Sequence, residues 1–239
     1  MDHMNGLVLG HHPRMDAFLD IGCGSGLFTT VAANAGFKKV VGFDYDPNCV
    51  EVSRRVAHRL ASDPGKIQLM QGDVLDGRFM GTLGRFSVVY AWGSLHHTNS
   101  MWEAINNGAQ AVEEDGLLVL AIYNKSWSSP FWKWVKRAYH YAPDWVRFLM
   151  IRAVCVVAAI AKAVYTGSNP FAQDRGMSFY YNIVDWVGGY PYEYASVSDM
   201  MAWIKDSEFE LLETRRGKTP IACNEFVLRK KPGQAARNH

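Results

Sequence analysis

The chain has 239 residues, of which 49% are hydrophobic and 20% charged, so it can bury a core and is neither disordered nor fibrous. Its formal charge of +2 is too balanced for a protein that binds nucleic acid over much of its surface. The four cysteines lie far apart without a CxxC pair, and the N-terminal stretch lacks an apolar signal core. We therefore expect one cytoplasmic domain without a metal site or a disulfide framework.

The first half of the chain alternates short apolar runs with helical patterns. The apolar runs predict strands over 17–21, 40–43, 67–70, 86–90 and 117–123. Helices are predicted over 27–35, 47–62 and 101–112, with Pro47 well placed at a helix start. Strands joined by helical crossovers predict a mostly parallel α/β sheet with helices on both faces.

The second half predicts two helices within 126–165, broken at Pro143, and then irregular, aromatic-rich chain over 167–196. A helix over 197–206 and two strands over 209–215 and 221–229 complete the pattern. The two strands are close in sequence and predict a hairpin, which brings the sheet to seven strands. We expect a single domain over 1–239, in which 126–195 is an inserted lid or substrate-binding segment.

A glycine-rich loop follows the first predicted strand. Its glycines permit a tight turn and let a ligand approach a helix N-terminus. Dinucleotide sites have the spacing GxGxxG, whereas here the third glycine comes one residue earlier. An aspartate two residues before the first glycine would repel a pyrophosphate and suit a cationic amino acid. The loop therefore favours S-adenosylmethionine (SAM) over NAD, and its expected cofactor contacts are Asp20, Gly22, Cys23, Gly24 and Gly26.

Further candidate cofactor residues follow the next three predicted strands. Asp44, next to Tyr45, ends the second strand, where a carboxylate can accept hydrogen bonds from both ribose hydroxyls. Asp73 follows the third strand and could bind the adenine amino group, although it could instead cap a helix. Trp92 ends the fourth strand, where its side chain could lie against the cofactor or could simply pack in the core. Ligands bind at the carboxyl ends of strands in open α/β sheets, so these positions predict one nucleoside site.

The chain resembles the class I SAM-dependent methyltransferases in FLDIGCGSG, VVGFDYD, QGDV, FSVVYAWGSLHHT and EEDGLLVLAIYN, which cover most of 17–124. The terminal hairpin is similar to the reversed seventh strand of that family. Within it, the chain looks most like the small-molecule branch around the ubiquinone-biosynthesis methylases, and the segments 175–196 and 222–230 resemble an uncharacterised bacterial subgroup. The resemblance implies a Rossmann-like fold, SAM as cofactor and S-adenosylhomocysteine as product. It also implies that the methionine end of SAM lies at the glycine loop and its adenine at Asp73 and Val74.

Candidate catalytic residues follow the fourth and fifth strands. Methyl transfer is an in-line displacement, so alignment of the acceptor accounts for much of the rate. A base is needed when the acceptor is a hydroxyl, an ammonium or a carbon acid. His96 or His97 is expected to act as this base or to orient the acceptor, although both could simply form a helix-start turn. Tyr123 and Asn124 share the same rim, where Asn124 can orient an acceptor oxygen or nitrogen.

A segment rich in polar aromatic residues, 175–194, could close a pocket above the sheet. Its arginine suits an anionic group such as a carboxylate or a phosphate. The alternative is a rigid loop that packs on its own tyrosines. The expected substrate contacts are Arg175, Tyr180, Tyr181, Asp185, Tyr190 and, on the last strand, Asn224.

The predicted helical insertion is basic. Residues 125–162 contain seven Lys and Arg and one acid, so they carry +6 and the rest of the chain carries −4. Four of the eight tryptophans also lie there. On its first helix, helical spacing places Phe131, Trp134, Val135 and Ala138 on one face, largely opposite Lys133, Lys136, Arg137 and His140. The apolar run 153–161 is much shorter than the roughly 20 residues of a membrane span.

This insertion has three interpretations. In the first, it forms a lid over the active site, and this lid could also make a homodimer contact. In the second, it is a peripheral membrane-binding segment, which would suit a lipid-like acceptor. In the third, it binds nucleic acid, which is disfavoured because no RNA-binding motif accompanies it.

The pattern as a whole predicts a SAM-dependent methyltransferase that acts on an oxygen or nitrogen, less readily a carbon, of a small molecule. The alternatives are an NAD(P)-dependent oxidoreductase and a non-catalytic SAM-binding, membrane-docking module.

Overall fold

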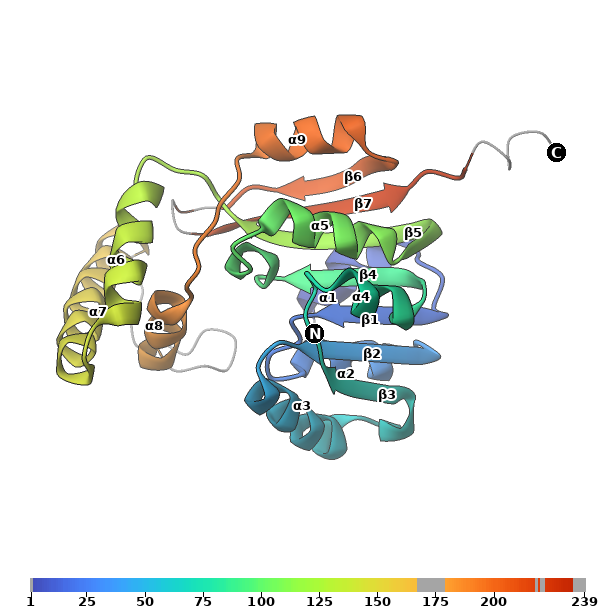
Figure 1. The fold of residues 1–239 in the computed structure, drawn as a ribbon, viewed down its shortest axis with the longest axis horizontal. Coiled ribbons are helices and arrows are strands. Elements are labelled where there is room, and N and C mark those ends of the chain that lie inside the picture. Colours follow the sequence, from blue (N-terminus) through green and yellow to red (C-terminus); the bar gives the residue numbers. More distant parts are fainter. Residues whose placement is uncertain (1, 167–178, 218, 220–221, 234–239) are drawn as a thin grey trace. The chain divides into compact units, whose positions relative to one another are not determined.

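The computed structural model describes residues 2–166, 179–217, 219 and 222–233 (Figure 1). The chain divides into two compact units, one formed by 1–126 with 194–239 and the other by 127–193. We call the first the sheet unit and the second the helical unit, and describe each by itself.

The sheet unit is built on seven strands in the order β3-β2-β1-β4-β5-β7-β6 (Figure 1). β1 to β5 are parallel, whereas β7 runs antiparallel to both of its neighbours. The strands are β1 (Ala17–Ile21), β2 (Lys39–Asp44), β3 (Ile67–Gln71), β4 (Phe86–Trp92), β5 (Val112–Tyr123), β6 (Phe209–Arg215) and β7 (Cys223–Lys230). The predicted seven-stranded, mostly parallel sheet with a terminal hairpin is confirmed.

Helices cover both faces of this sheet. Side chains alternate along β1, so Phe18 packs with α1 and α2 on one face and Leu19 packs with α5 and α9 on the other. Both clusters are fully buried, which explains why the parallel strands are continuously apolar in sequence. The helices of this unit are α1 (Asp2–Leu7), α2 (Leu27–Ala35), α3 (Pro47–Leu60), α4 (Gly77–Leu83), α5 (Met101–Gln110) and α9 (Val197–Asp206).

Local capping residues explain several of these helix starts. Asp46 accepts a hydrogen bond from the backbone N–H of Asn48, and Pro47 occupies the first turn of α3. Ser196 and Asp199 form a reciprocal capping box at the start of α9. The sequence analysis missed α4, a short helix that is capped by Asp76 and contains glycine. It also missed α1 and extended α5 to Val112, which instead begins β5.

The helical unit contains α6 (Ser129–Tyr141), α7 (Asp144–Thr166) and α8 (Phe179–Gly188), which pack on one another. The first two confirm the predicted pair of helices. α8 corrects the expectation of irregular chain over 167–196, because contacts distant in sequence stabilise it. The ring of Trp132 on α6 lies edge-on to Trp186 on α8, with the ring centroids 4.6 Å apart. Residues 167–178 lie outside the described part of the chain.

The predicted faces of α6 are partly wrong. Lys136 is fully buried rather than exposed, because its ammonium donates to the backbone carbonyl of Trp186 and lies 4.4 Å from the centre of the Trp186 ring. Phe131 and Trp134, expected on the apolar contact face, are 58% and 68% exposed. Val135 is buried as expected. Within the described residues, no helix is long and apolar enough to span a membrane.

Candidate active site

The carboxyl ends of the parallel strands bring most of the predicted site residues to one edge of the sheet. Asp44 at the end of β2 pairs with Gln71 at the end of β3, and Trp92 of β4 pairs with Ala121 of β5. The following loops stay adjacent, because the N–H of Gly22 donates to Phe43 and that of Gly72 donates to Asp44. The sheet register thus brings together side chains that are far apart in sequence.

The three loop glycines have positive φ angles of 70°, 53° and 73°, but they differ in their surroundings. A Cβ atom on Gly22 would lie 2.3 Å from the Cβ of Ser94, and one on Gly26 would lie 2.9 Å from the Cα of Ser53. A Cβ on Gly24 would have no other described atom within 4 Å. Gly22 and Gly26 are therefore required for packing, whereas Gly24 faces open space.

The carboxylate of Asp44 is held firmly beside this open position. One oxygen accepts a hydrogen bond of 2.9 Å from the N–H of Gly24, and the other accepts one of 3.0 Å from the N–H of Asp46. The loop therefore presents the carboxylate in a fixed orientation, and each oxygen retains a second lone pair for a ligand hydroxyl. The neighbouring Tyr45 side chain is 73% exposed.

Asp20 is buried against α2. Its side chain is 3% exposed and accepts a hydrogen bond of 2.6 Å from the hydroxyl of Thr29 on α2. Burial raises the pKa of this carboxyl to about 7, the hydrogen bond from Thr29 opposes that shift, and the charge of Asp44 adds to it. In this structure the carboxyl of Asp20 contacts α2, and its expected role at the methionine end of a cofactor stays a prediction. The sequence analysis did not identify Thr29 as a partner of Asp20, because a threonine in the first turn of a helix is a weak signal of such a contact.

The thiol of Cys23 packs against Ser53 of α3. It is buried, and its sulfur lies 3.5 Å from the hydroxyl of Ser53. Desolvation raises the pKa of the thiol to about 12, so it is inert as a nucleophile. The hydroxyl of Ser53 also donates a hydrogen bond of 2.8 Å to the carbonyl of Gly24. Ser53, which the sequence analysis did not identify, therefore anchors the loop to α3.

The residues expected near adenine differ in their surroundings, and their role as adenine contacts stays a prediction. Asp73 is half-buried and accepts a hydrogen bond of 2.8 Å from the N–H of Leu75, whereas the cap of α4 is Asp76. The side chain of Val74 packs in the core instead of facing the sheet edge. The half-buried ring of Trp92 stacks on Tyr90 with centroids 5.5 Å apart, so it has a core contact on one side.

The two histidines have different surroundings. His96 is fully buried, and its Nδ1 accepts a hydrogen bond of 3.4 Å from the N–H of Tyr123. It therefore holds the turn after β4 against the end of β5. His97 is partly exposed, and its ring lies edge-on to Tyr123 at 5.6 Å. This difference makes His97, rather than His96, the histidine that a bound molecule can reach.

Asn224, the substrate contact predicted on the last strand, is buried against Asn124, and its role as a substrate contact stays a prediction. It is 1% exposed, and its amide donates to the side-chain oxygen of Asn124 at 3.0 Å. Its own side-chain oxygen accepts from the N–H of Gly217 at 3.1 Å. Asn224 therefore orients Asn124 from behind, and the half-buried Asn124 is the member of the pair nearer to solvent.

The other predicted substrate residues belong to the helical unit. Tyr180 and Tyr181 are exposed on α8, and Tyr190 packs against His140 with ring centroids 5.1 Å apart. Asp185 is exposed on α8. Their role as substrate contacts stays a prediction, and Arg175 lies outside the described residues.

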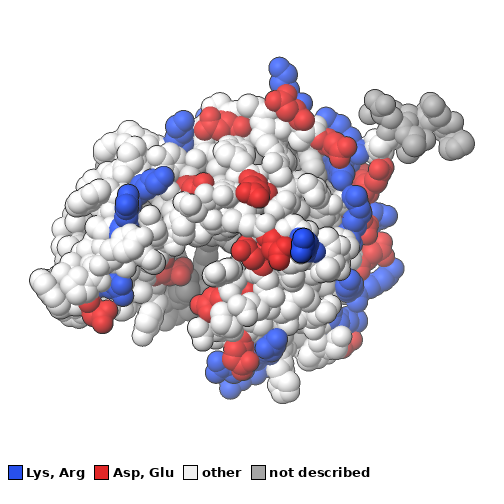
Figure 2. All heavy atoms as spheres, viewed as in Figure 1, with Lys and Arg blue, Asp and Glu red and all other residues white. Residues whose placement is uncertain are grey.

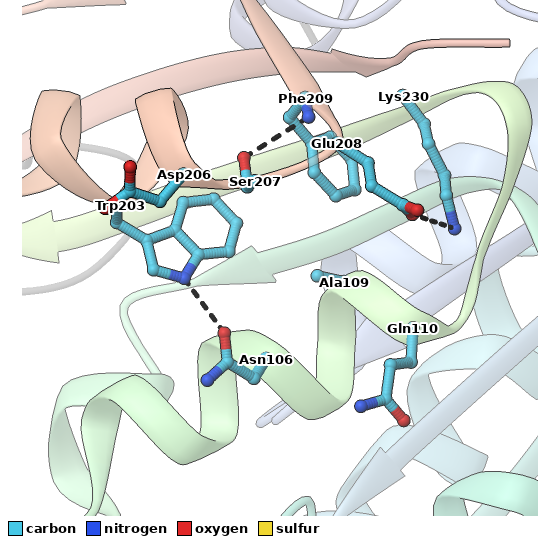
Figure 3. A pocket seen from close by; sticks show the side chains of 9 residues that line it. All are labelled: Asn106, Ala109, Gln110, Trp203, Asp206, Ser207, Glu208, Phe209 and Lys230. Carbon is cyan, nitrogen blue, oxygen red and sulfur yellow. Dashed lines mark hydrogen bonds and ion pairs between the residues drawn. The ribbon is translucent and has the colours of Figure 1, made fainter. Parts of the chain in front are cut away.

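Two adjoining cavities of about 340 and 490 Å³ lie at the opposite edge of the sheet. In the first, shown in Figure 3, the indole of Trp203 donates to Asn106 at 2.9 Å, and Lys230 lies 3.6 Å from Glu208. Lys230 also donates to Val112 at the start of β5, which places both cavities at the amino ends of the parallel strands. They are therefore distinct from the predicted site.

This sheet order, with a glycine loop after β1 and a fixed acid after β2, defines a Rossmann-like nucleotide-binding fold. The chain belongs to the Methyltransferase domain family, whose profile matches residues 7–157.

Solved structures share the fold at low sequence identity. The magnesium protoporphyrin IX methyltransferase of Synechocystis PCC 6803, with bound S-adenosylhomocysteine, is 15% identical with a TM-score of 0.58, over 96% of this chain and 81% of that one. The N-methyltransferase NodS of Bradyrhizobium japonicum, also with S-adenosylhomocysteine, is 14% identical with a TM-score of 0.55, over 96% and 84%.

Curated relatives match over shorter stretches. The ribosomal protein L11 methyltransferase of Lachnospira eligens is 35% identical over 63 residues, which is 26% of this chain and 20% of that protein. That of Thermosipho africanus is 28% identical over 109 residues, or 46% and 38%. The chain thus spans well under half the length of these relatives.

Proposed function

We propose that this protein is a SAM-dependent methyltransferase that transfers a methyl group to an oxygen or nitrogen of a small-molecule acceptor. The observation that carries the proposal is the pairing of an open glycine position, Gly24, with the fixed carboxylate of Asp44. Membership of a methyltransferase family favours this activity over the oxidoreductase alternative.

The residues at the carboxyl edge fit SAM. Gly24 leaves room for a ligand to approach the backbone, and the carboxylate of Asp44 can accept hydrogen bonds from two ribose hydroxyls. Asp73, at the end of the next strand, is the candidate acceptor for the adenine amino group. When bound, SAM supplies an electrophilic methyl group on a sulfonium. The protein holds this group, orients the acceptor and excludes water.

His97, Tyr123 and Asn124 form the proposed acceptor side of the site. A ring nitrogen of His97 would take the proton from an acceptor hydroxyl during methyl transfer, or from an acceptor ammonium before it, because an ammonium has no lone pair with which to attack. The amide of Asn124, oriented by Asn224, fixes the acceptor oxygen or nitrogen. Tyr123 packs against both histidines and keeps their turn in place.

A labelling experiment tests the acceptor class. The protein is incubated with methyl-labelled SAM and a cell extract, and the label is then partitioned among aqueous metabolites, lipids, RNA and protein. We expect label in a small molecule, aqueous or lipid. Label in protein alone would overturn the small-molecule acceptor and agree with the ribosomal-protein relatives. Absence of label together with stabilisation by NAD, and none by S-adenosylhomocysteine, would overturn methyl transfer itself.

Replacing His97 by alanine is expected to lower turnover about 10²–10⁴-fold, the usual contribution of a general base, with little change in cofactor affinity. Turnover is measured on the acceptor fraction found by labelling, and affinity by titration calorimetry with S-adenosylhomocysteine. His96→Ala is the matched comparison, because its buried ring supports β5 and its loss should lower the melting temperature. Equal losses of turnover and affinity in His97→Ala would show that His97 is structural.

The raised pKa of Asp20 predicts a pH-dependent stability. The native carboxyl binds its proton more tightly than the unfolded one, because its pKa is about 7 instead of 3.8. The stabilisation is therefore complete below the unfolded pKa and is lost as the pH rises through about 7. We expect the free energy of unfolding of the ligand-free protein, measured with urea, to fall by a few kcal/mol between about pH 4 and pH 8.

Asp20→Asn should remove this fall, because an amide stays neutral. The matched control is Asp16→Asn. Asp16 is an exposed acid, and its hydrogen bond with Lys38 lowers its pKa. An unchanged pH profile in Asp20→Asn would show that Asp20 does not titrate near neutral pH.

A further inference from the structure

The helical unit exposes an unusual number of large apolar side chains. Trp127, Trp134 and Trp145 are 89%, 68% and 69% exposed. On α7 the exposed apolar positions recur with helical spacing, so they form one face along most of that helix. They are Trp145, Phe148, Leu149, Val156, Val157 and Ile160. An apolar face of this extent on a protein surface marks an interaction site.

The contacts described between α6 and α8 are made by other side chains. α6 and α8 are joined by Trp132 against Trp186 and by the buried ammonium of Lys136. α7 turns Ile151, which is 3% exposed, to the opposite side from Trp145 and Leu149. The exposed face is thus available for a partner while the packing of the unit stays intact.

The charges around this face are almost all positive. Lys133, Arg137 and Arg152 are exposed on α6 and α7. The guanidinium of Arg152 lies 4.9 Å from the centre of the Phe148 ring. The single acid of these two helices, Asp144, lies 3.4 Å from Arg147. Figure 2 shows the visible surface over these helices as mostly uncharged, with Lys and Arg side chains among the white ones and one acidic group at its lower end.

We propose that this face, defined by the exposed apolar residues of α6 and α7 with Lys133, Arg137 and Arg152, docks on the surface of an anionic lipid bilayer. Tryptophan has an apolar body and a polar N–H, which suits the boundary between headgroups and acyl chains. Basic residues beside it are attracted by anionic headgroups. α7 does not qualify as a membrane span, so it lies along the surface. The proposal does not depend on methyl transfer.

The test uses the full chain and flotation with vesicles of phosphatidylcholine, alone or mixed with phosphatidylglycerol. We expect binding to the anionic vesicles, weaker binding to the neutral ones, a loss of binding at high salt and a blue shift of tryptophan fluorescence. Lys133→Glu/Arg137→Glu should weaken binding at least about tenfold, because each basic residue near the surface contributes about a fivefold factor. Trp145→Ser/Leu149→Ser should weaken binding to a similar degree.

Matched controls come from the sheet unit. Arg59→Glu/Arg78→Glu makes the same charge change, and Leu60→Ser/Met201→Ser makes a similar apolar change, each at exposed positions. These variants should bind anionic vesicles like the original protein. All four replace exposed side chains, so their melting temperatures should stay close to the original. Absence of binding to anionic vesicles, or equal losses in all four variants, would overturn the proposal. A concentration-dependent dimer without vesicle binding would overturn it too and assign the face to a second copy of the chain.

Discussion

Replacing Gly22 by alanine is expected to cost about 3–5 kcal/mol of stability, the range of severe single substitutions. The new Cβ would lie 2.3 Å from the Cβ of Ser94, and alanine is strained at a φ of 70°. Ser94 cannot retreat freely, because its hydroxyl donates to the carbonyl of Ile21 at 2.7 Å. Urea unfolding measures the loss, and S-adenosylhomocysteine titration shows whether any folded fraction binds.

A double-mutant cycle separates the clash from the backbone strain. Ser94→Gly removes the atom that a Cβ on Gly22 would meet, so Gly22→Ala/Ser94→Gly should recover part of the stability lost in Gly22→Ala. Gly24→Ala is the matched glycine, because its Cβ meets no described atom within 4 Å. It should cost only about 1 kcal/mol of stability and yet weaken cofactor binding strongly. Normal cofactor affinity in Gly24→Ala would show that the open space beside Gly24 is not the cofactor cradle.

Asp44→Ala is expected to weaken the binding of S-adenosylhomocysteine by about 1.5–3 kcal/mol, or roughly ten- to 150-fold. The loss has two sources, which are the ribose hydrogen bonds proposed for the carboxylate and its hold on the N–H of Gly24. Titration calorimetry measures the affinity. Asp44→Asn should lose less, because an amide oxygen can still accept one of these hydrogen bonds.

The control is Asp46→Ala, two residues further along the chain. Asp46 caps α3 through the N–H of Asn48, so its loss should lower stability by about 1 kcal/mol without a comparable change in affinity. Unchanged affinity in Asp44→Ala would refute the assignment of Asp44 as the residue that binds the ribose. Equal losses of affinity in Asp44→Ala and Asp46→Ala would attribute the effect to the loop and not to the carboxylate.

Most of the secondary structure could be predicted, because it depends on local patterns. α2 and α9 begin and end at the predicted residues, since α2 is followed by Gly36 with a left-handed φ and α9 starts at its own capping box. The exceptions are elements that depend on distant contacts. α8 is rich in Tyr, Trp and Val, and its sequence alone favours irregular or extended chain. It is a helix because α6 and α7 supply its contacts.

The sequence by itself determined which residues reach the carboxyl edge of the sheet. The strand pattern and the positions of Gly22, Gly24 and Asp44 were enough, because parallel strands must end at the same edge. Only the tertiary structure decided which way the side chains face. Asp20 contacts Thr29, His96 supports β5, and Asn224 stands behind Asn124. A buried polar group must find a partner, and which partner is within reach depends on packing that no local pattern describes.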